Sequence, residues 1–128
     1  MSSETPKKLS FPFPAPAGLL QEPVDISENG LSILEKRYLL RDDSLKTVET
    51  VPEMYWRVAS FVASRAVDAE EKSTLDKAVK YYRMISSLRF SPNSPTFTGA
   101  GTPLGQLAAC FVLAIEDDMG KEIGRAHV

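Results

Sequence analysis

The chain has 128 residues, with 15 lysines and arginines against 17 aspartates and glutamates, and 43% of its residues are hydrophobic. This length allows one domain, at roughly 100 to 200 residues per domain. A formal charge of −2 gives no general electrostatic reason to bind nucleic acid or an anionic membrane. A single cysteine excludes an internal disulfide and favours a reducing, cytoplasmic setting. No apolar run approaches the roughly 20 residues that a membrane-spanning helix needs.

The first 24 residues predict an extended arm. Five of the nine prolines lie within the first 23 residues. Proline lacks a backbone N–H and fixes φ, so this segment favours neither helix nor sheet. The Phe11–Pro16 stretch could be a polyproline ligand, but a linker or docking arm is our preferred interpretation.

Three amphipathic helices are predicted next, and together they form a small helical lobe. The first begins after Ser27 as its N-cap and ends before Arg41, and a loop or weak hairpin follows over 41–49. Thr50 and Glu53 predict a capping box that starts the second helix. Its expected buried residues are Met54, Val58, Phe61, Val62 and the stem of Arg65, with Trp56 as a flank. The third helix is expected from about Ser73 to Leu88, with Leu75, Ala78, Val79, Tyr82 and Ile85 on its buried face.

The C-terminal third changes character. Residues 91–105 are rich in Pro and Gly and predict a shaped loop without a regular element. The apolar run 107–115 is too short for most buried helices and is typical of a strand covered on both faces. The chain has no second strand of comparable quality. We therefore expect the partners of this strand to lie outside this polypeptide, and the chain to be incomplete.

The last seven residues, 122–128, match the translation of a widely used sequencing adapter. We therefore expect the biological sequence to end near Gly120 or Lys121. The alternative is a genuine C-terminus that has these residues by chance. On the adapter hypothesis, His127, the only histidine, is neither a base nor a ligand.

Two features are candidates for chemistry: the loop Asn93–Thr96 with its following glycines, and Cys110. Hydroxyls beside a Gly-rich backbone suit the binding of phosphate oxygens, although these are also ordinary loop residues. A cysteine among apolar residues is by default a small buried hydrophobe. The chain has no CxxC pair, so the spacing predicts no metal site.

The two features occur together and in order, and their combination resembles a known family. The matching runs are Ser91–Thr96, Ala100–Leu107 and Ala109–Leu113. They resemble the large catalytic subunit of ribonucleotide reductases, specifically the adenosylcobalamin-dependent class II enzymes. The 31–38 helix and the Val51–Met54 helix start resemble the N-terminal helical region of that family, and the whole resemblance covers about 25–119.

The resemblance implies a mainly α fold, in which a small N-terminal helical lobe leads into the first strand of a ten-stranded α/β barrel that is truncated here. Together with the Pro-rich arm (1–24) and the adapter-like tail (122–128), it divides the chain into the helical lobe (25–90) and a substrate-side loop with the first barrel strand (91–121).

The resemblance also implies roles for individual residues. Cys110 would be one of two redox-active cysteines that supply two electrons to the substrate ribose. The residues expected to approach the substrate are Ser94, Pro95 and Thr96 on the phosphate side and Ala109 beside the thiol. Thr98 and Ala108 depart from the family pattern, in which a larger residue and a serine are common.

For the parent protein, the resemblance implies conversion of ribonucleoside di- or triphosphates to deoxyribonucleotides for DNA synthesis. It further implies adenosylcobalamin as cofactor, a thiol reductant such as thioredoxin, and a homodimer as the assembly. The second redox cysteine, the radical cysteine, the cobalamin site and the effector site are all expected downstream. We therefore expect the 128-residue polypeptide alone to be inactive.

Two alternatives remain open. A class I large subunit is disfavoured because its loop usually has Leu-Pro-Thr-Pro and its later cysteine follows Ser-Ser. A small helical interaction module, using its proline arm and apolar face, is the alternative outside the enzymes.

Overall fold

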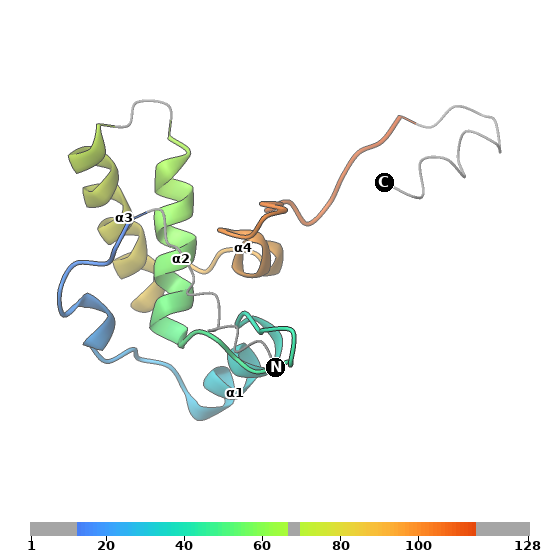
Figure 1. The fold of residues 1–128 in the computed structure, drawn as a ribbon, viewed down its shortest axis with the longest axis horizontal. Helices are drawn as coiled ribbons and strands as arrows, with labels where there is room; N and C mark the ends of the chain where they lie inside the picture. The colour runs from blue at the N-terminus through green and yellow to red at the C-terminus, as the bar shows by residue number, and fades with distance from the viewer. Residues whose placement is uncertain (1–12, 67–69, 115–128) are drawn as a thin grey trace, which may run out of the picture.

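The computed structural model describes residues 13–66 and 70–114. These residues form a 3-10 turn and four α-helices: η1 (Leu19–Gln21), α1 (Glu28–Arg37), α2 (Val51–Ser64), α3 (Glu71–Ser86) and α4 (Ser94–Gly99). Helix α2 lies at the centre and contacts η1, α1, α3 and α4 (Figure 1). No strand is present in these ranges, so the mainly helical prediction is confirmed there. None of the described helices is long and apolar enough to cross a membrane.

Local capping signals set the starts of α1 and α2 as predicted. The Ser27 hydroxyl accepts a hydrogen bond from the Gly30 amide at 3.1 Å. At the start of α2, the Glu53 amide donates to the Thr50 hydroxyl at 3.3 Å, and the Thr50 amide donates to the Glu53 carboxylate at 3.2 Å. These bonds satisfy amide groups that have no partner within the helix. Between the two helices, a single bridge pairs Arg41 with Thr47 in a weak hairpin.

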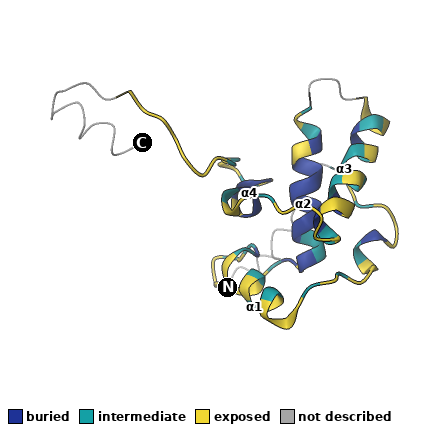
Figure 2. Ribbon diagram, turned by 180° about the vertical axis from the view of Figure 1, so that it is seen from behind, coloured by how far each residue is buried: buried dark blue, intermediate teal, exposed yellow. Residues whose placement is uncertain are grey.

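Helix α2 is buried around most of its circumference (Figure 2). Met54, Val58 and Phe61 are buried, as predicted. Trp56 was expected only as a flank but is completely buried, because other elements cover α2 on several sides. The buried surface is therefore wider than the single stripe that helical spacing suggests.

The prediction of the buried face of α2 is wrong for two residues. Val62 is 38% exposed, and Arg65 is also exposed. The Arg65 guanidinium instead lies 4.8 Å from the centroid of the Phe61 ring, which is a cation–π arrangement. Val62 lies in the last turn of α2 and Arg65 is its C-cap residue, and both lie on other sides of the helix than the buried Ala63.

Helix α3 supplies the second wall of the core. Its buried residues include Ala78, Tyr82 and Ile85, and Leu75 and Val79 are half-buried, as predicted. The helix begins and ends two residues earlier than expected. The Tyr82 ring packs edge-on against Trp56, with 6.2 Å between centroids.

The N-terminal segment also contributes to the core. Most of 13–24 is irregular, but η1 turns the chain there and buries Leu19. The Trp56 indole N–H donates to the Phe13 carbonyl oxygen at 2.8 Å. This segment therefore packs against α2, and its Glu22 forms an ion pair with Arg83 of α3 at 3.1 Å. Residues 1–12 lie outside the described residues.

The predicted loop 91–105 contains a helix, α4, and this corrects the prediction of no regular element. Pro95 lies in the first turn, where its missing N–H removes no intrahelical bond. Phe97 anchors the helix, because it is buried and its ring lies 5.8 Å from the Tyr38 ring and 6.2 Å from the Tyr55 ring.

The apolar run beginning at Leu107 forms no strand in its described part, 107–114. This segment runs away from the helices (Figure 1). Phe111 is 61% exposed and Val112 is fully exposed. A strand needs a neighbour for its backbone groups, and none of the described residues pairs with it. Ile115 and the adapter-like tail with His127 lie outside the described residues.

Replacing Tyr82 with phenylalanine tests the core. Within the described residues, the buried Tyr82 hydroxyl has no hydrogen-bond partner. Tyr82→Phe removes this unsatisfied group and keeps the ring, so the free energy of unfolding should rise by roughly 1 kcal/mol. Urea unfolding followed by Trp56 fluorescence measures the change. Tyr81→Phe, at a half-buried position of the same helix, is the control and should change little.

The same hydroxyl gives a second readout. Burial, with a smaller effect of Glu22, raises the pKa of Tyr82 above its ordinary 10.0. The free energy of unfolding of the wild type is therefore constant with respect to this group below pH 10 and falls as the pH rises toward the folded-state pKa. Tyr82→Phe should lose less of its free energy of unfolding over the same pH range, which urea unfolding at each pH measures. A Tyr82→Phe protein that is less stable than wild type by 1 kcal/mol or more would show that the hydroxyl is satisfied.

Candidate functional site

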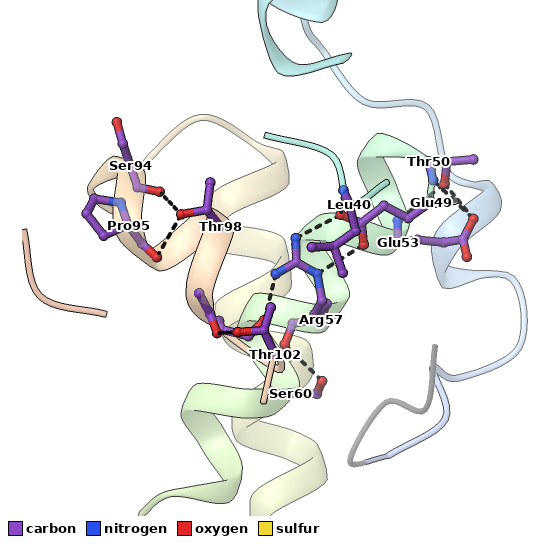
Figure 3. A network of polar contacts seen from close by, with 12 residues as sticks. Leu40, Glu49, Thr50, Glu53, Arg57, Ser60, Ser94, Pro95, Thr98 and Thr102 are labelled. Atoms are coloured by element: carbon purple, nitrogen blue, oxygen red, sulfur yellow. Dashed lines mark hydrogen bonds and ion pairs between the residues drawn. The ribbon is translucent and has the colours of Figure 1, made fainter. Parts of the chain in front are cut away.

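A buried ion pair joins α2 to the segment before it, and the same arginine also binds the segment that follows α4. Arg57 Nη2 lies 2.8 Å from Glu49 Oε1, and Arg57 Nε lies 3.0 Å from Glu49 Oε2. Arg57 Nη1 donates to the Ala100 carbonyl oxygen at 2.6 Å, and the Leu40 amide donates to Glu49 Oε1 at 2.9 Å (Figure 3). Both charged side chains are at most 2% exposed. The pair therefore holds three segments of the chain together.

Two glycines allow the chain to reverse after α4. A Cβ at Gly99 would lie 1.9 Å from the Gln106 carbonyl oxygen, so the returning chain lies directly against this glycine. Gly101 has a φ of +73°, and a Cβ there would lie 2.9 Å from Arg57 Cγ. The Thr102 hydroxyl donates to the Gly99 carbonyl oxygen at 2.7 Å, which tightens the turn. A side chain at either glycine is therefore incompatible with this turn.

After the turn, the returning chain is hydrogen-bonded to the start of α4. The Asn93 side-chain amide and the Thr96 hydroxyl both donate to the Leu107 carbonyl oxygen, each at 3.4 Å. The Thr96 hydroxyl is also in a short contact with the Asn93 side-chain oxygen. Thr96 is buried, and its hydroxyl already makes its hydrogen bonds within this loop.

The predicted site residues fall into two groups. Ser94, Pro95 and Thr96 lie together on the first turn of α4, and Ser94 is exposed. Figure 3 shows Ser94 and Pro95 on this turn. Ala109 and Cys110 are exposed on the segment that leaves the lobe. The thiol is therefore not buried as its apolar neighbours suggest. The roles assigned to these five residues stay predictions.

The Ser94 hydroxyl has a partner at the C-cap of α1. Its oxygen lies 3.0 Å from the Tyr38 hydroxyl oxygen. Sequence reasoning missed this contact, and it also missed Arg57 and Glu49. A charged residue inside the apolar α2 pattern, directly after Trp56, was the available signal for Arg57.

An apolar pocket of about 560 Å³ lies between α2, α3 and the segment before α4. Its lining includes Val62, Tyr81, Met84, Phe90 and Leu107. These side chains offer few groups that could bind a phosphate, so the pocket does not supply the predicted polar site.

Tyr55 is a second tyrosine with a shifted pKa, in addition to Tyr82. Burial raises the pKa of Tyr55 above its ordinary 10.0, because the ionised phenolate would be poorly solvated there. Within 13–66 and 70–114, no three or more His, Cys, Asp or Glu side chains gather in a way that could hold a metal ion.

Gly99→Ala should lower the free energy of unfolding by at least about 3 kcal/mol, because the new Cβ meets a backbone oxygen that has to move. The neighbouring exposed Thr98→Ala is the matched control and should lose less than about 0.5 kcal/mol. Urea unfolding of both variants measures the difference. Equal stability of the two variants would show that the chain does not pass against Gly99.

The sequence of this chain matches one protein family and is similar to several known proteins. Residues 24–105 match the family described as ribonucleotide reductase, all-alpha domain. The vitamin B12-dependent ribonucleoside-diphosphate reductase of Mycobacterium tuberculosis is 36% identical over 100 residues, which cover 78% of this chain and 14% of that protein. The corresponding protein of Thermoplasma acidophilum is 27% identical over 155 residues, covering 78% and 20%. The ribonucleoside-diphosphate reductase large chain of Schizosaccharomyces pombe is 36% identical over 89 residues, covering 70% and 10%.

The chain thus spans between a tenth and a fifth of the length of these relatives. The family match covers more than half of the chain, from the start of the helical lobe to the glycine turn after α4. The chain therefore belongs to the ribonucleotide reductase family, of which it contains the all-alpha domain.

Proposed function

We propose that the chain is the N-terminal part of a ribonucleotide reductase large chain, which converts ribonucleoside diphosphates to deoxyribonucleotides for DNA synthesis. The observation that carries this proposal is the family match over 24–105, followed directly by the segment with Cys110. The diphosphate substrate is supported by the relatives, which are named ribonucleoside-diphosphate reductases. The same match favours a reductase over an independent helical interaction module.

The first turn of α4 would face the substrate phosphates. Ser94 is exposed, so its hydroxyl is accessible to a phosphate oxygen. The Thr96 hydroxyl is occupied within the loop, so Pro95 and Thr96 would contribute through their backbone. Ala109 would adjoin the substrate beside the thiol.

Cys110 would act as one of two redox thiols. Two thiols together supply two electrons and two protons to the ribose, whose 2′-hydroxyl group leaves as water while a disulfide forms. Cys110 is the single cysteine of this sequence, so its partner would come from further polypeptide. An external dithiol protein such as thioredoxin would then reduce the disulfide.

The segment 107–115 would become the first strand of a ten-stranded α/β barrel in the complete protein. The exposure of Phe111 and Val112 supports this, because both side chains lack cover among the described residues. The division into an arm (1–24), a helical lobe (25–90) and a substrate-side segment (91–121) belongs to the same proposal.

We further propose the adenosylcobalamin-dependent class II. Ser94 and Pro95 follow an asparagine, where class I enzymes usually have Leu-Pro-Thr-Pro, and Cys110 follows two alanines instead of two serines. Two of the three relatives described above are B12-dependent. The described residues do not fit a cobalamin site, because their pocket of about 560 Å³ has an almost wholly apolar lining, whereas the corrin ring carries many polar amide groups. Cobalamin, which would supply the radical, would be held elsewhere in the parent. A class I large subunit is the second candidate, favoured by the similarity to the Schizosaccharomyces pombe large chain.

The test is turnover by the full-length protein. With adenosylcobalamin and a dithiol, it should form deoxycytidine diphosphate from cytidine diphosphate. Cys110→Ser should reduce multiple turnover to background, because a hydroxyl cannot form the disulfide. Ala108→Ser introduces the residue that is common in relatives and should retain turnover. The 128-residue chain alone should form no product.

Product formation by the 128-residue chain would overturn the proposed division of the site. Turnover that requires a metal-containing partner subunit in place of adenosylcobalamin would select class I. A full-length protein that is inactive under both conditions would overturn the proposed function.

A further inference from the structure

The Tyr38 and Ser94 hydroxyls connect two helices that are distant in sequence. Their oxygens lie 3.0 Å apart although the residues are 56 positions apart. Tyr38 is the C-cap residue of α1, and Ser94 is the first residue of α4. This is the one hydrogen bond of the Ser94 hydroxyl within the described residues.

Tyr38 is held in place independently of Ser94. Its backbone amide donates to the Leu34 carbonyl oxygen at 2.9 Å. Its ring packs against Phe97, with 5.8 Å between centroids, and Phe97 is buried in the core. The Tyr38 hydroxyl is therefore a fixed reference point beside α4, whereas a serine hydroxyl alone can rotate among three staggered positions.

Hydrogen-bond chemistry gives this contact a direction when a phosphate is present. The oxygens of an ionised phosphate accept hydrogen bonds only, so Ser94 has to donate its one proton to them. The Tyr38 hydroxyl then has to be the donor to Ser94 Oγ. A chain of donors of this kind polarises each member and strengthens the final bond.

We propose that Tyr38 is a positioning residue that orients the Ser94 hydroxyl to donate to a phosphate group of a ribonucleoside diphosphate. This inference rests on the proposed function, because Ser94 faces the substrate phosphates there. Tyr38 itself does not touch the substrate. It acts through Ser94, so its effect should depend on the presence of the serine hydroxyl.

The experiment uses the full-length protein with cytidine diphosphate as the probe. Calorimetry without adenosylcobalamin gives the Kd, and turnover with adenosylcobalamin gives KM and kcat. Tyr38→Phe keeps the ring against Phe97 and should raise Kd and KM roughly three- to ten-fold, the effect of one neutral hydrogen bond. The kcat should stay within about two-fold, because substrate and transition state lose this bond equally.

A double-mutant cycle separates positioning from a structural role. Ser94→Ala should raise Kd at least as much as Tyr38→Phe, and the double variant should bind no more weakly than Ser94→Ala. Tyr81→Phe is the matched control, because the Tyr81 hydroxyl makes no hydrogen bond to the described residues and lies at the apolar pocket. It should leave Kd unchanged. Thermal unfolding of each variant verifies that the fold is retained.

Several outcomes would overturn the inference. An unchanged Kd in Tyr38→Phe would do so, as would two single effects that multiply in the double variant. A loss in kcat alone would also contradict it. If the wild-type protein neither binds nor reduces cytidine diphosphate, the proposed function itself fails. If the wild-type protein does both and one of the outcomes above is seen, only the role of Tyr38 is overturned.

Discussion

The ion pair between Arg57 and Glu49 is the interaction on which the arrangement of the lobe depends. It is the point where α2, the hairpin before it and the turn after α4 meet. Removing one partner from a buried pair typically costs about 3 to 5 kcal/mol, because the other charge is left without compensation. That is a large share of the roughly 5 to 15 kcal/mol by which domains are stable. Three segments of the chain are thus coupled through one guanidinium group.

The coupling reaches the candidate site through the backbone. Arg57 holds the Ala100 carbonyl, Gly99 allows Gln106 to return beside it, and the returning chain is fastened to the start of α4. The lobe therefore sets the position of Ser94 relative to the point where the chain departs toward Cys110. Under the proposed function, the lobe would be a scaffold for one side of the reductase site, and the barrel of the proposed parent would supply the other side.

Short-range signals in the sequence predicted much of the lobe. The Ser27 cap, the Thr50 and Glu53 capping box and the buried face of α3 all depend on residues within one or two helical turns. Such features are decided locally, so spacing is sufficient to predict them. The resemblance of the loop and cysteine block predicted the family, which the match over 24–105 supports.

The features that residue spacing did not predict depend on contacts between residues that are far apart in the sequence. The burial of Arg57 requires Glu49 and the turn after α4 to lie beside it, and the contact of Tyr38 with Ser94 joins two separate helices. Proline and glycine between 91 and 105 indicated a loop, and the anchoring of Phe97 between two tyrosine rings made part of it helical. Tertiary contacts decided these positions, and a single sequence does not display them.

A double-mutant cycle at the ion pair tests the central claim most directly. The unfolding free energies of the 128-residue chain would be measured for Glu49→Leu, Arg57→Met and the double variant. We predict that each single change destabilises strongly and that the double variant loses less than the two losses combined, with a coupling free energy on the order of 3 kcal/mol. Losses that simply add would contradict the account, because they would show that the two side chains contribute separately to the fold.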